Sequence, residues 1–227
     1  MLHAQTNVMQ GMPNMGGDGA NQVDHAMSTQ HMDMGPHMKM TAMRSVKPGD
    51  QERAQQIVEA ARRVCEKYKD YKVALADGFH IFMPTVRQEM YHFNNFEYAH
   101  EAAEHFNPEH PTSLLYQKDG DGYMLIGVMY TAPKWTSQDE LNERVPLSIA
   151  QWHAHVNLCL APPNRNQAGS GPGGKFGING SISTQGDCEA AGGRFVPQIF
   201  GWMVHVYPFE QKPEDIWSVE RQMHGMN

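Results

Sequence analysis

The chain has 227 residues and a formal net charge of −7 with histidine counted as neutral. This length suits one domain, or one domain with a tail. The acidic balance argues against a nucleic-acid partner, because phosphate binding needs clustered Lys and Arg side chains. We expect no membrane span, because no run approaches the roughly 20 apolar residues that cross a bilayer. We also expect no signal peptide in the chain as written, although a mature exported chain would have lost one.

Two different compositions are joined in this chain. Ten of its 17 methionines and four of its 13 histidines lie in residues 1–43. Residues 1–47 show no helical or strand periodicity and few aliphatic side chains, so this segment cannot bury enough apolar surface to offset its ordering entropy. We therefore expect a disordered Met/His-rich tail over 1–47, followed by a single α+β domain over 48–227.

The tail alternates thioether and imidazole donors. Thioether sulfur selects Cu(I), and imidazole accepts copper in either oxidation state. The stretch resembles the Met- and His-rich segments of bacterial periplasmic copper-resistance proteins, which implies copper binding. The alternative is a flexible linker that is rich in Met by chance. The predicted tail donors are His31, Met32, Met34, His37, Met38 and Met40.

Helices are predicted first in the domain. Asp50 is the expected N-cap of a helix whose apolar positions run to Tyr68, and a second helical piece covers 70–77 and ends at Gly78. Residues 79–93 are expected to be loop and strand, and 96–105 a short polar helix. We expect these N-terminal helices to pack on an antiparallel sheet.

Strand patterns dominate from residue 113 onward. Segments 113–117 and 123–131 predict a hairpin around the turn at 119–122. A capping box at 137–140 begins a short helix that ends near Arg144. Two strong strands are predicted within 148–160 and 200–209, separated by a loop over 163–183 and one helical turn over 186–191. A closing turn is expected over 213–219.

The two strong strands carry the candidate metal site. Side chains alternate between the faces of a strand, so His153 and His155 share one face, together with Asn157 and Cys159. In the later strand His205 shares a face with Met203 and Tyr207. If the strands are neighbours, three imidazoles converge, and three neutral imidazoles bind Zn, Cu, Ni or Fe with an open position. The alternative is that these histidines are ordinary surface or core residues.

Three other motifs are rejected. The His-x-His pair lacks the glutamate that follows it in a cupin. His100 and His105 are five residues apart, so they diverge on a helix and do not form a zinc-protease motif; a solvated helix face is preferred to a second metal site. The glycine-rich stretch at 169–176 has Phe176 where a phosphate loop needs Ser or Thr.

The three cysteines have different expected roles. Cys159 and Cys188 could form a disulfide in an oxidising compartment, worth about 3 kcal/mol on the chain-entropy model. In the rival interpretation, Cys159 is a thiolate ligand beside His155. Cys65 lies on the apolar stripe of the first helix and is expected to be a buried free thiol.

Several blocks over roughly 55–210 resemble an uncharacterised group of secreted bacterial proteins. The blocks are a Tyr-x-Asp helix, a Tyr-His-x-x-Asn segment at 91–95, a Leu-x-Tyr strand at 114–116, a Leu-Ile-Gly-Val-x-Tyr strand at 125–130 and His-Val-Tyr at 205–207. Gln117 and Met129 stand where that group has acidic residues, and the His153/His155 pair is not part of its pattern. The resemblance implies export and an α+β fold. It also adds His92 as a fourth candidate ligand.

The resulting functional hypothesis is a periplasmic or secreted copper-binding protein that captures or buffers copper or confers resistance. The tail would collect copper and raise its concentration near the folded site, with a copper chaperone or exporter as partner. One alternative is a copper-dependent oxidoreductase in which Tyr207 acts as proton donor or redox partner. The third is a structural zinc module. The predicted ligands of the folded site are His153, His155 and His205, with His92 or Met203 completing the set.

Overall fold

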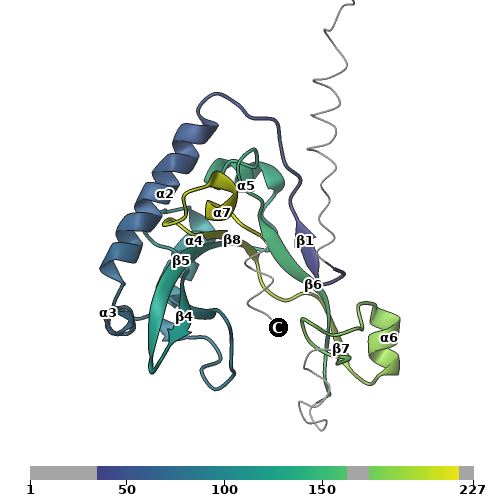
Figure 1. Ribbon diagram of the computed structural model, residues 1–227. Coiled ribbons are helices and arrows are strands. Elements are labelled where there is room, and N and C mark those ends of the chain that lie inside the picture. The colour runs from purple at the N-terminus through teal and green to yellow at the C-terminus, as the bar shows by residue number, and fades with distance from the viewer. Residues whose placement is uncertain (1–34, 163–173, 220–227) are drawn as a thin grey trace, which may run out of the picture. The chain divides into compact units, whose positions relative to one another are not determined.

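The computed structural model describes residues 35–162 and 174–219 (Figure 1). The chain divides into two units, Met1–Asp33 and Met34–Asn227. Of the predicted tail donors, His31, Met32 and Met34 lie outside the described residues. Residues 35–47 belong to the folded unit, so the expected tail boundary at 47 is placed too late. No helix among the described residues is both long and apolar enough to cross a membrane.

The predicted α+β class and antiparallel sheet are confirmed. Eight strands form the sheet in the order β1-β6-β8-β5-β4-β3-β2, with β7 paired to β6, and every pairing is antiparallel. The strands are β1 (Met38–Met40), β2 (His80–Ile81), β3 (Tyr91–Asn94), β4 (Ser113–Asp119), β5 (Gly122–Ala132), β6 (His153–Leu160), β7 (Arg194–Gln198) and β8 (Trp202–Val206).

Six helices are described, and most begin at a side-chain cap. They are α2 (Asp50–Lys67), α3 (Tyr71–Ala76), α4 (Phe96–Glu104), α5 (Gln138–Arg144), α6 (Gln185–Ala190) and α7 (Pro213–Ile216). Asp70, Asn95 and Thr184 cap α3, α4 and α6, and the predicted capping box of Ser137 and Glu140 is present at α5.

The expected N-cap of α2 is wrong by one residue. Gly49 occupies the cap with a φ of 89°, and Asp50 is the first helical residue. The Asp50 carboxylate accepts hydrogen bonds from the Lys47 backbone N–H and the Ser148 hydroxyl. These bonds lower the pKa of Asp50, and they join the start of α2 to the segment before β6.

The main hydrophobic core lies on one face of the sheet. It combines α2 residues such as Ile57 and Val64 with strand residues such as Val128, Trp152 and Val204. Helix α2 runs beside β5 in Figure 1, and the two elements are in contact. Because strand side chains alternate, the residues between these core positions project to the opposite face.

Two strands were not predicted from the sequence. Strand β1 pairs with β6 in the register Met38↔His155 and Met40↔His153, and β7 pairs with the second half of β6. The Cys159–Cys188 disulfide joins β6 to α6. The disulfide interpretation is therefore confirmed, and the proposal of Cys159 as a thiolate ligand is wrong. Cys65 is a buried free thiol, as expected.

Candidate metal centre

A group of imidazoles and thioethers lies on the face of the sheet opposite the main core. We call it the His/Met cluster. In antiparallel strands, directly opposed side chains lie on the same face, and the pairings His153↔Met203 and His205↔Met129 follow this rule across β6, β8 and β5. Its members are His92, His153, His155, His205, Met90, Met129 and Met203.

The predicted convergence of imidazoles from β6 and β8 is present. The ring centroids of His153 and His205 are 5.2 Å apart, and those of His153 and His155 are 5.6 Å apart. Two imidazoles that share one metal at about 2.0 Å per bond hold their ring centroids roughly 5 Å apart. The spacing of these rings is therefore close to that of a metal-bound pair.

His92 reaches the same place because the sheet is curved. Its strand β3 is separated from β8 by β4 and β5, which in a flat sheet is a distance of about 14 Å at 4.7–4.9 Å per strand. The ring centroids of His92 and His205 are only 5.8 Å apart. Figure 1 shows the curvature of β4, β5, β8 and β6, which directs the side chains of one face toward each other.

An aromatic contact joins the residue after β2 to the connection between β7 and β8. The Phe82 backbone N–H donates to the His92 carbonyl, and the Ile199 N–H donates to the His155 carbonyl. The rings of Phe82 and Phe200 then meet edge to face with centroids 6.1 Å apart. Both rings are about 40% exposed, at 39% and 41%. The Phe82–Phe200 pair therefore lies at the surface, beside the backbone of two histidines in the cluster.

Two buried ring nitrogens in the cluster make no hydrogen bond among the described residues. They are Nδ1 of His153 and Nε2 of His205, in side chains only 1% and 3% exposed. Each ring also has a polar contact: His153 hydrogen-bonds to the Met203 backbone, and the Tyr207 hydroxyl lies 3.4 Å from His205 Nδ1. Second contacts of this kind orient metal-binding histidines. An unpaired buried polar atom is costly, so a ligand at these nitrogens would remove a penalty.

All four imidazoles are held in the neutral form at neutral pH. Burial lowers the pKa of His92 to about 4 and that of His155 to about 4. Burial, with the neighbouring imidazoles, also lowers the pKa values of His153 and His205 well below the ordinary value of 6.5. A neutral imidazole binds a metal without first losing a proton.

Thioether sulfur is close to these rings. The Tyr207 hydroxyl donates to Met90 Sδ at 3.6 Å while it contacts His205 Nδ1. Met90, Met129 and Met203 pack in one buried cluster with Tyr207. Gly127 makes room for the tyrosine, because a Cβ at that position would approach its ring to 2.9 Å.

The structure brings together some of the predicted donors and separates others. The cluster contains five of the predicted donors: His92, His153, His155, His205 and Met203. It also contains Met90 and Met129, which were not predicted from the sequence. Met129 carries a recognisable signal, because it alternates with core residues in β5. Met90 precedes β3 and has no periodic signal.

The three described donors of the predicted tail have different positions. His37 Nε2 lies 2.6 Å from the Gly180 carbonyl, so this nitrogen is already engaged. Met38 and Met40 are half-buried in β1, opposite His155 and His153. Within residues 35–162 and 174–219, no group of three or more His, Cys, Asp or Glu side chains is placed to hold a metal ion.

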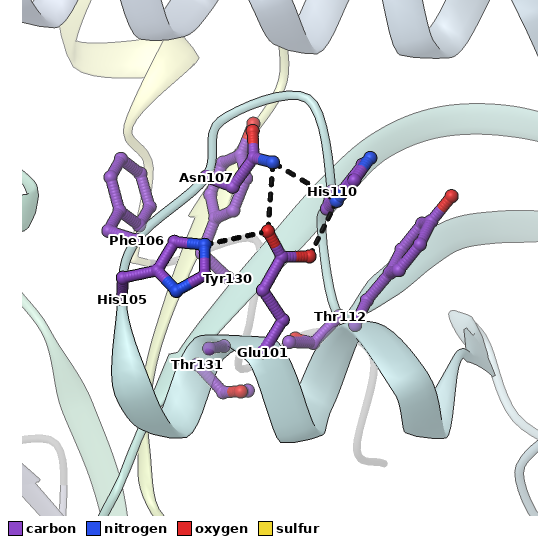
Figure 2. Close-up of a pocket in the computed structure, with 10 residues that line it drawn as sticks. Glu101, His105, Phe106, Asn107, His110, Thr112, Tyr130 and Thr131 are labelled. Carbon is purple, nitrogen blue, oxygen red and sulfur yellow. Dashed lines mark hydrogen bonds and ion pairs between the residues drawn. The ribbon is translucent and has the colours of Figure 1, made fainter.

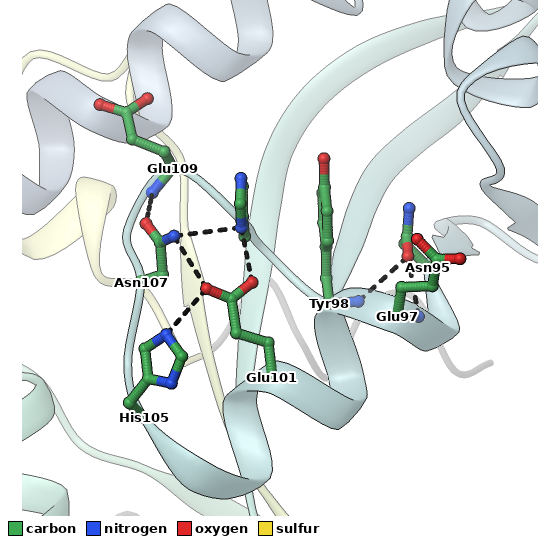
Figure 3. A network of polar contacts seen from close by, with 8 residues as sticks. Asn95, Glu97, Tyr98, Glu101, His105, Asn107 and Glu109 are labelled. Carbon is green, nitrogen blue, oxygen red and sulfur yellow. Dashed lines mark hydrogen bonds and ion pairs between the residues drawn. The ribbon is translucent and has the colours of Figure 1, made fainter.

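A second group of histidines lies at the end of α4 (Figures 2 and 3). The Glu101 carboxylate is 2.9 Å from His105 Nε2 and 2.5 Å from His110 Nδ1, and it accepts a hydrogen bond from Asn107 Nδ2 at 3.0 Å. The His110 ring stacks on Tyr98, with centroids 4.3 Å apart. Asn107 and the two histidines lower the pKa of Glu101. We call this set the Glu101 network.

The polar side chains of the Glu101 network hydrogen-bond to one another. Figure 2 shows that its side chains border a small pocket with Phe106 and Tyr130. The contacts of Glu101 connect α4 to the loop that leads into β4, so they hold this turn in place. The network therefore has a structural role. His105 contacts Glu101, which is compatible with the prediction that His100 and His105 diverge on the helix.

Comparisons with known proteins give no relative for this chain. No family model matches it, and neither a curated protein nor a solved structure is significantly similar.

Proposed function

We propose that the protein binds copper at the His/Met cluster. One observation carries the proposal: His153 and His205 are adjacent buried imidazoles, with ring centroids 5.2 Å apart, and each has a nitrogen without a hydrogen-bond partner among the described residues. Each ring also contacts a second group, the Met203 backbone for His153 and the Tyr207 hydroxyl for His205. Metal-binding histidines are commonly oriented by a second contact of this kind.

The donor types favour copper over other metals. The cluster combines neutral imidazoles with thioethers, and copper accepts both, whereas zinc gains little from a thioether and Mg or Ca gains nothing. A structural zinc module remains the competing interpretation. It would require a closed set of four strong ligands, and no such set of His, Cys, Asp or Glu side chains is placed around one point in the described residues.

The biological role that suits such a site is capture or buffering of copper outside the cytoplasm. The Cys159–Cys188 disulfide supports an oxidising compartment, either periplasmic or extracellular. The Met/His-rich residues before β1 would collect copper, and a chaperone or exporter would exchange copper with the site. Strand β1 follows that segment in the chain, and its residues Met38 and Met40 pair with His155 and His153.

Copper binding is tested on the full-length chain by histidine substitution. Paired changes His153→Asn and His205→Asn should remove one tightly bound copper per chain. The matched control is His105→Asn with His110→Asn, because those imidazoles are also clustered but face the Glu101 carboxylate. Copper is counted by elemental analysis after dialysis against a weak chelator.

NMR of isotope-labelled histidine separates the cluster from the tail in the same samples. A metal at the cluster should shift Nδ1 of His153 and Nε2 of His205 before the tail histidines respond. The proposal is overturned if the first copper equivalent shifts only tail resonances, or if both paired variants retain the same copper as the unmodified chain.

One observation favours a copper-dependent oxidoreductase as a second candidate function. The buried Tyr207 hydroxyl contacts both His205 Nδ1 and Met90 Sδ, so a phenol lies next to two residues of the proposed metal site. A phenol in this position can supply a proton or an electron. Tyr207→Phe should abolish turnover with retained copper if the protein is an enzyme, and should leave copper exchange unchanged if it is a carrier.

A further inference from the structure

We infer that the cluster selects a soft monovalent ion, Cu(I), and that Met90, Met129 and Met203 supply ligands alongside His153 and His205. This inference rests on the proposed copper function and deepens it, because it names the oxidation state and adds two donors, Met90 and Met129, that were not predicted from the sequence.

The imidazoles alone are an incomplete ligand set. No three His, Cys, Asp or Glu side chains in the described parts of the chain are placed around one point, although His153 and His205 offer two unpartnered nitrogens. Further ligands must therefore come from another residue type. Of the remaining side chains, methionine provides the metal donor that Cu(I) prefers and that hard divalent ions reject.

Each of the three methionines is held beside one of these histidines. Met203 is paired with His153 in the sheet, and Met129 is paired with His205. Met90 is tied to His205 through Tyr207, whose hydroxyl contacts both side chains.

All three methionines are at least nine-tenths buried, with exposed fractions of 5% to 7%. A buried methionine commonly fills space in a core. Here three buried methionines lie beside two buried rings with unsatisfied nitrogens, so we expect them to serve as ligands as well as packing.

The lack of charged side chains in the cluster also favours a monovalent ion. The cluster contains neutral imidazoles and thioethers, and the one cysteine on β6 is removed from ligation by its disulfide with Cys188. An ion placed there therefore keeps its full charge in a buried environment. The desolvation cost of an ion grows with the square of its charge, so a divalent ion pays about four times that of a monovalent ion of equal size.

Strand β1 extends the thioether set to the edge of the sheet. Met40 lies opposite His153 and Met38 lies opposite His155, and both methionines are half-buried. Directly opposed side chains in antiparallel strands lie within about 4.5–5.5 Å at Cβ. Met38 and Met40 thus add two thioethers at the edge of the sheet, next to the buried cluster.

Ag(I) is the redox-inert probe for this inference, and Cu(I) is measured under anaerobic reduction by competition with a coloured Cu(I) chelator. The test variant is the full-length chain with Met90→Leu, Met129→Leu and Met203→Leu, which conserves volume. Met124→Leu is the matched control, because Met124 lies on the same strand as Met129 but is 51% exposed.

We expect the triple variant to bind Ag(I) and Cu(I) at the cluster at least tenfold more weakly, with no more than a twofold change for Zn(II). The control should match the unmodified chain. Histidine-ring NMR reports the cluster separately from the tail, and single variants replace the triple variant if its melting curve shows loss of the fold.

Two results are decisive against the inference. Equal Ag(I) affinity in the triple variant and the control would remove the thioethers from the ligand set. Tighter binding of Zn(II) or Cu(II) than of Ag(I) at His153 and His205 would refute the monovalent preference and leave copper binding intact. Failure of the proposed function itself looks different, because then no metal shifts the resonances of these two rings.

Discussion

Two groups of histidines in this protein share a residue type and differ in what surrounds it. In the Glu101 network, His105 and His110 face a carboxylate and remain at least one-third exposed, with side-chain exposures of 64% and 39%. In the His/Met cluster, His153 and His205 are buried, face no carboxylate in the described residues and each leave one nitrogen unpartnered. Proximity of histidines alone therefore does not identify a metal site. The useful criterion is whether the ring nitrogens are already satisfied.

The largest expected difference between the two groups is stabilisation by copper. A ligand that binds only the folded state at a free concentration 1,000 times its Kd stabilises by about 4 kcal/mol. Thermal melts with buffered copper should show this gain in the unmodified chain and in the His105→Asn/His110→Asn variant. The gain should disappear in the His153→Asn/His205→Asn variant. Equal stabilisation of all three proteins would place the effect outside the cluster.

Replacement by an apolar side chain should affect the two groups differently in metal-free protein. His153→Leu and His205→Leu each remove a buried unpaired nitrogen, whose cost is about 1–3 kcal/mol, but they also remove the contact of the ring with the Met203 backbone or the Tyr207 hydroxyl. The two effects oppose each other, so the stability of these variants should stay within about 1 kcal/mol of the unmodified chain. His110→Leu removes a partner of Glu101 and should destabilise the protein. Chemical denaturation measures both changes, and a loss of several kcal/mol in His153→Leu would show that its unpaired nitrogen carries no penalty.

Acid should destabilise the metal-free protein through the cluster. Burial lowers the pKa of His92 and His155 to about 4 from 6.5, so between these pH values the unfolded chain binds protons that the folded chain does not. Stability contributed by neutral burial is therefore complete above pH 6.5 and is lost as pH falls toward 4.

The slope of the free energy of unfolding against pH tests this account. Each fully depressed histidine contributes up to about 1.4 kcal/mol per pH unit in that window. His155→Leu should flatten the slope, whereas His100→Leu, at an exposed position of α4, should leave it unchanged. Parallel curves for His155→Leu and the unmodified chain would contradict the assigned burial.

The smallest expected effect comes from the Glu101 network. Its hydrogen bonds lower the pKa of Glu101 below 4.5, so the associated stability is present above pH 4.5 and is lost as pH falls through the folded-state pKa. Glu101→Gln should lower the Tm at pH 7 by no more than about 2–4 °C, as for other exposed ion pairs. The Tm values of the two proteins should converge in acid, and a constant difference at all pH values would indicate lost packing instead.

Sequence periodicity predicted the two central strands of the site but not strand β1 or the contact of His92 with His205. The alternation of apolar and donor residues identified both strands that carry His153 and His205, because a half-buried strand has a period of two. It could not reveal β1, since a three-residue strand has too few positions for a period and is stabilised by pairing with β6. Similarly, the contact of His92 with His205 arises from sheet curvature, which no local pattern encodes.

Helix and loop features were predictable from the sequence only where a short local motif defines them. The capping box of Ser137 and Glu140 was predicted in full. The cap of α2 was misassigned because Asp50 satisfies a backbone N–H from within the first turn, while Gly49 takes the left-handed position. Met90 and the Glu101 network depend on tertiary contacts, so they became visible only in the folded chain.

The disulfide on β6 determines which kind of sulfur this protein can offer a metal. Cys159 is bonded to Cys188 and Cys65 is buried under the opposite face, so methionine is the available sulfur donor at the cluster. A thiolate site requires a reducing environment to stay open, whereas two thioethers cannot join to form a disulfide. On the proposed copper function, the thioethers of the cluster would stay available as soft donors in surroundings where cysteines pair into disulfides.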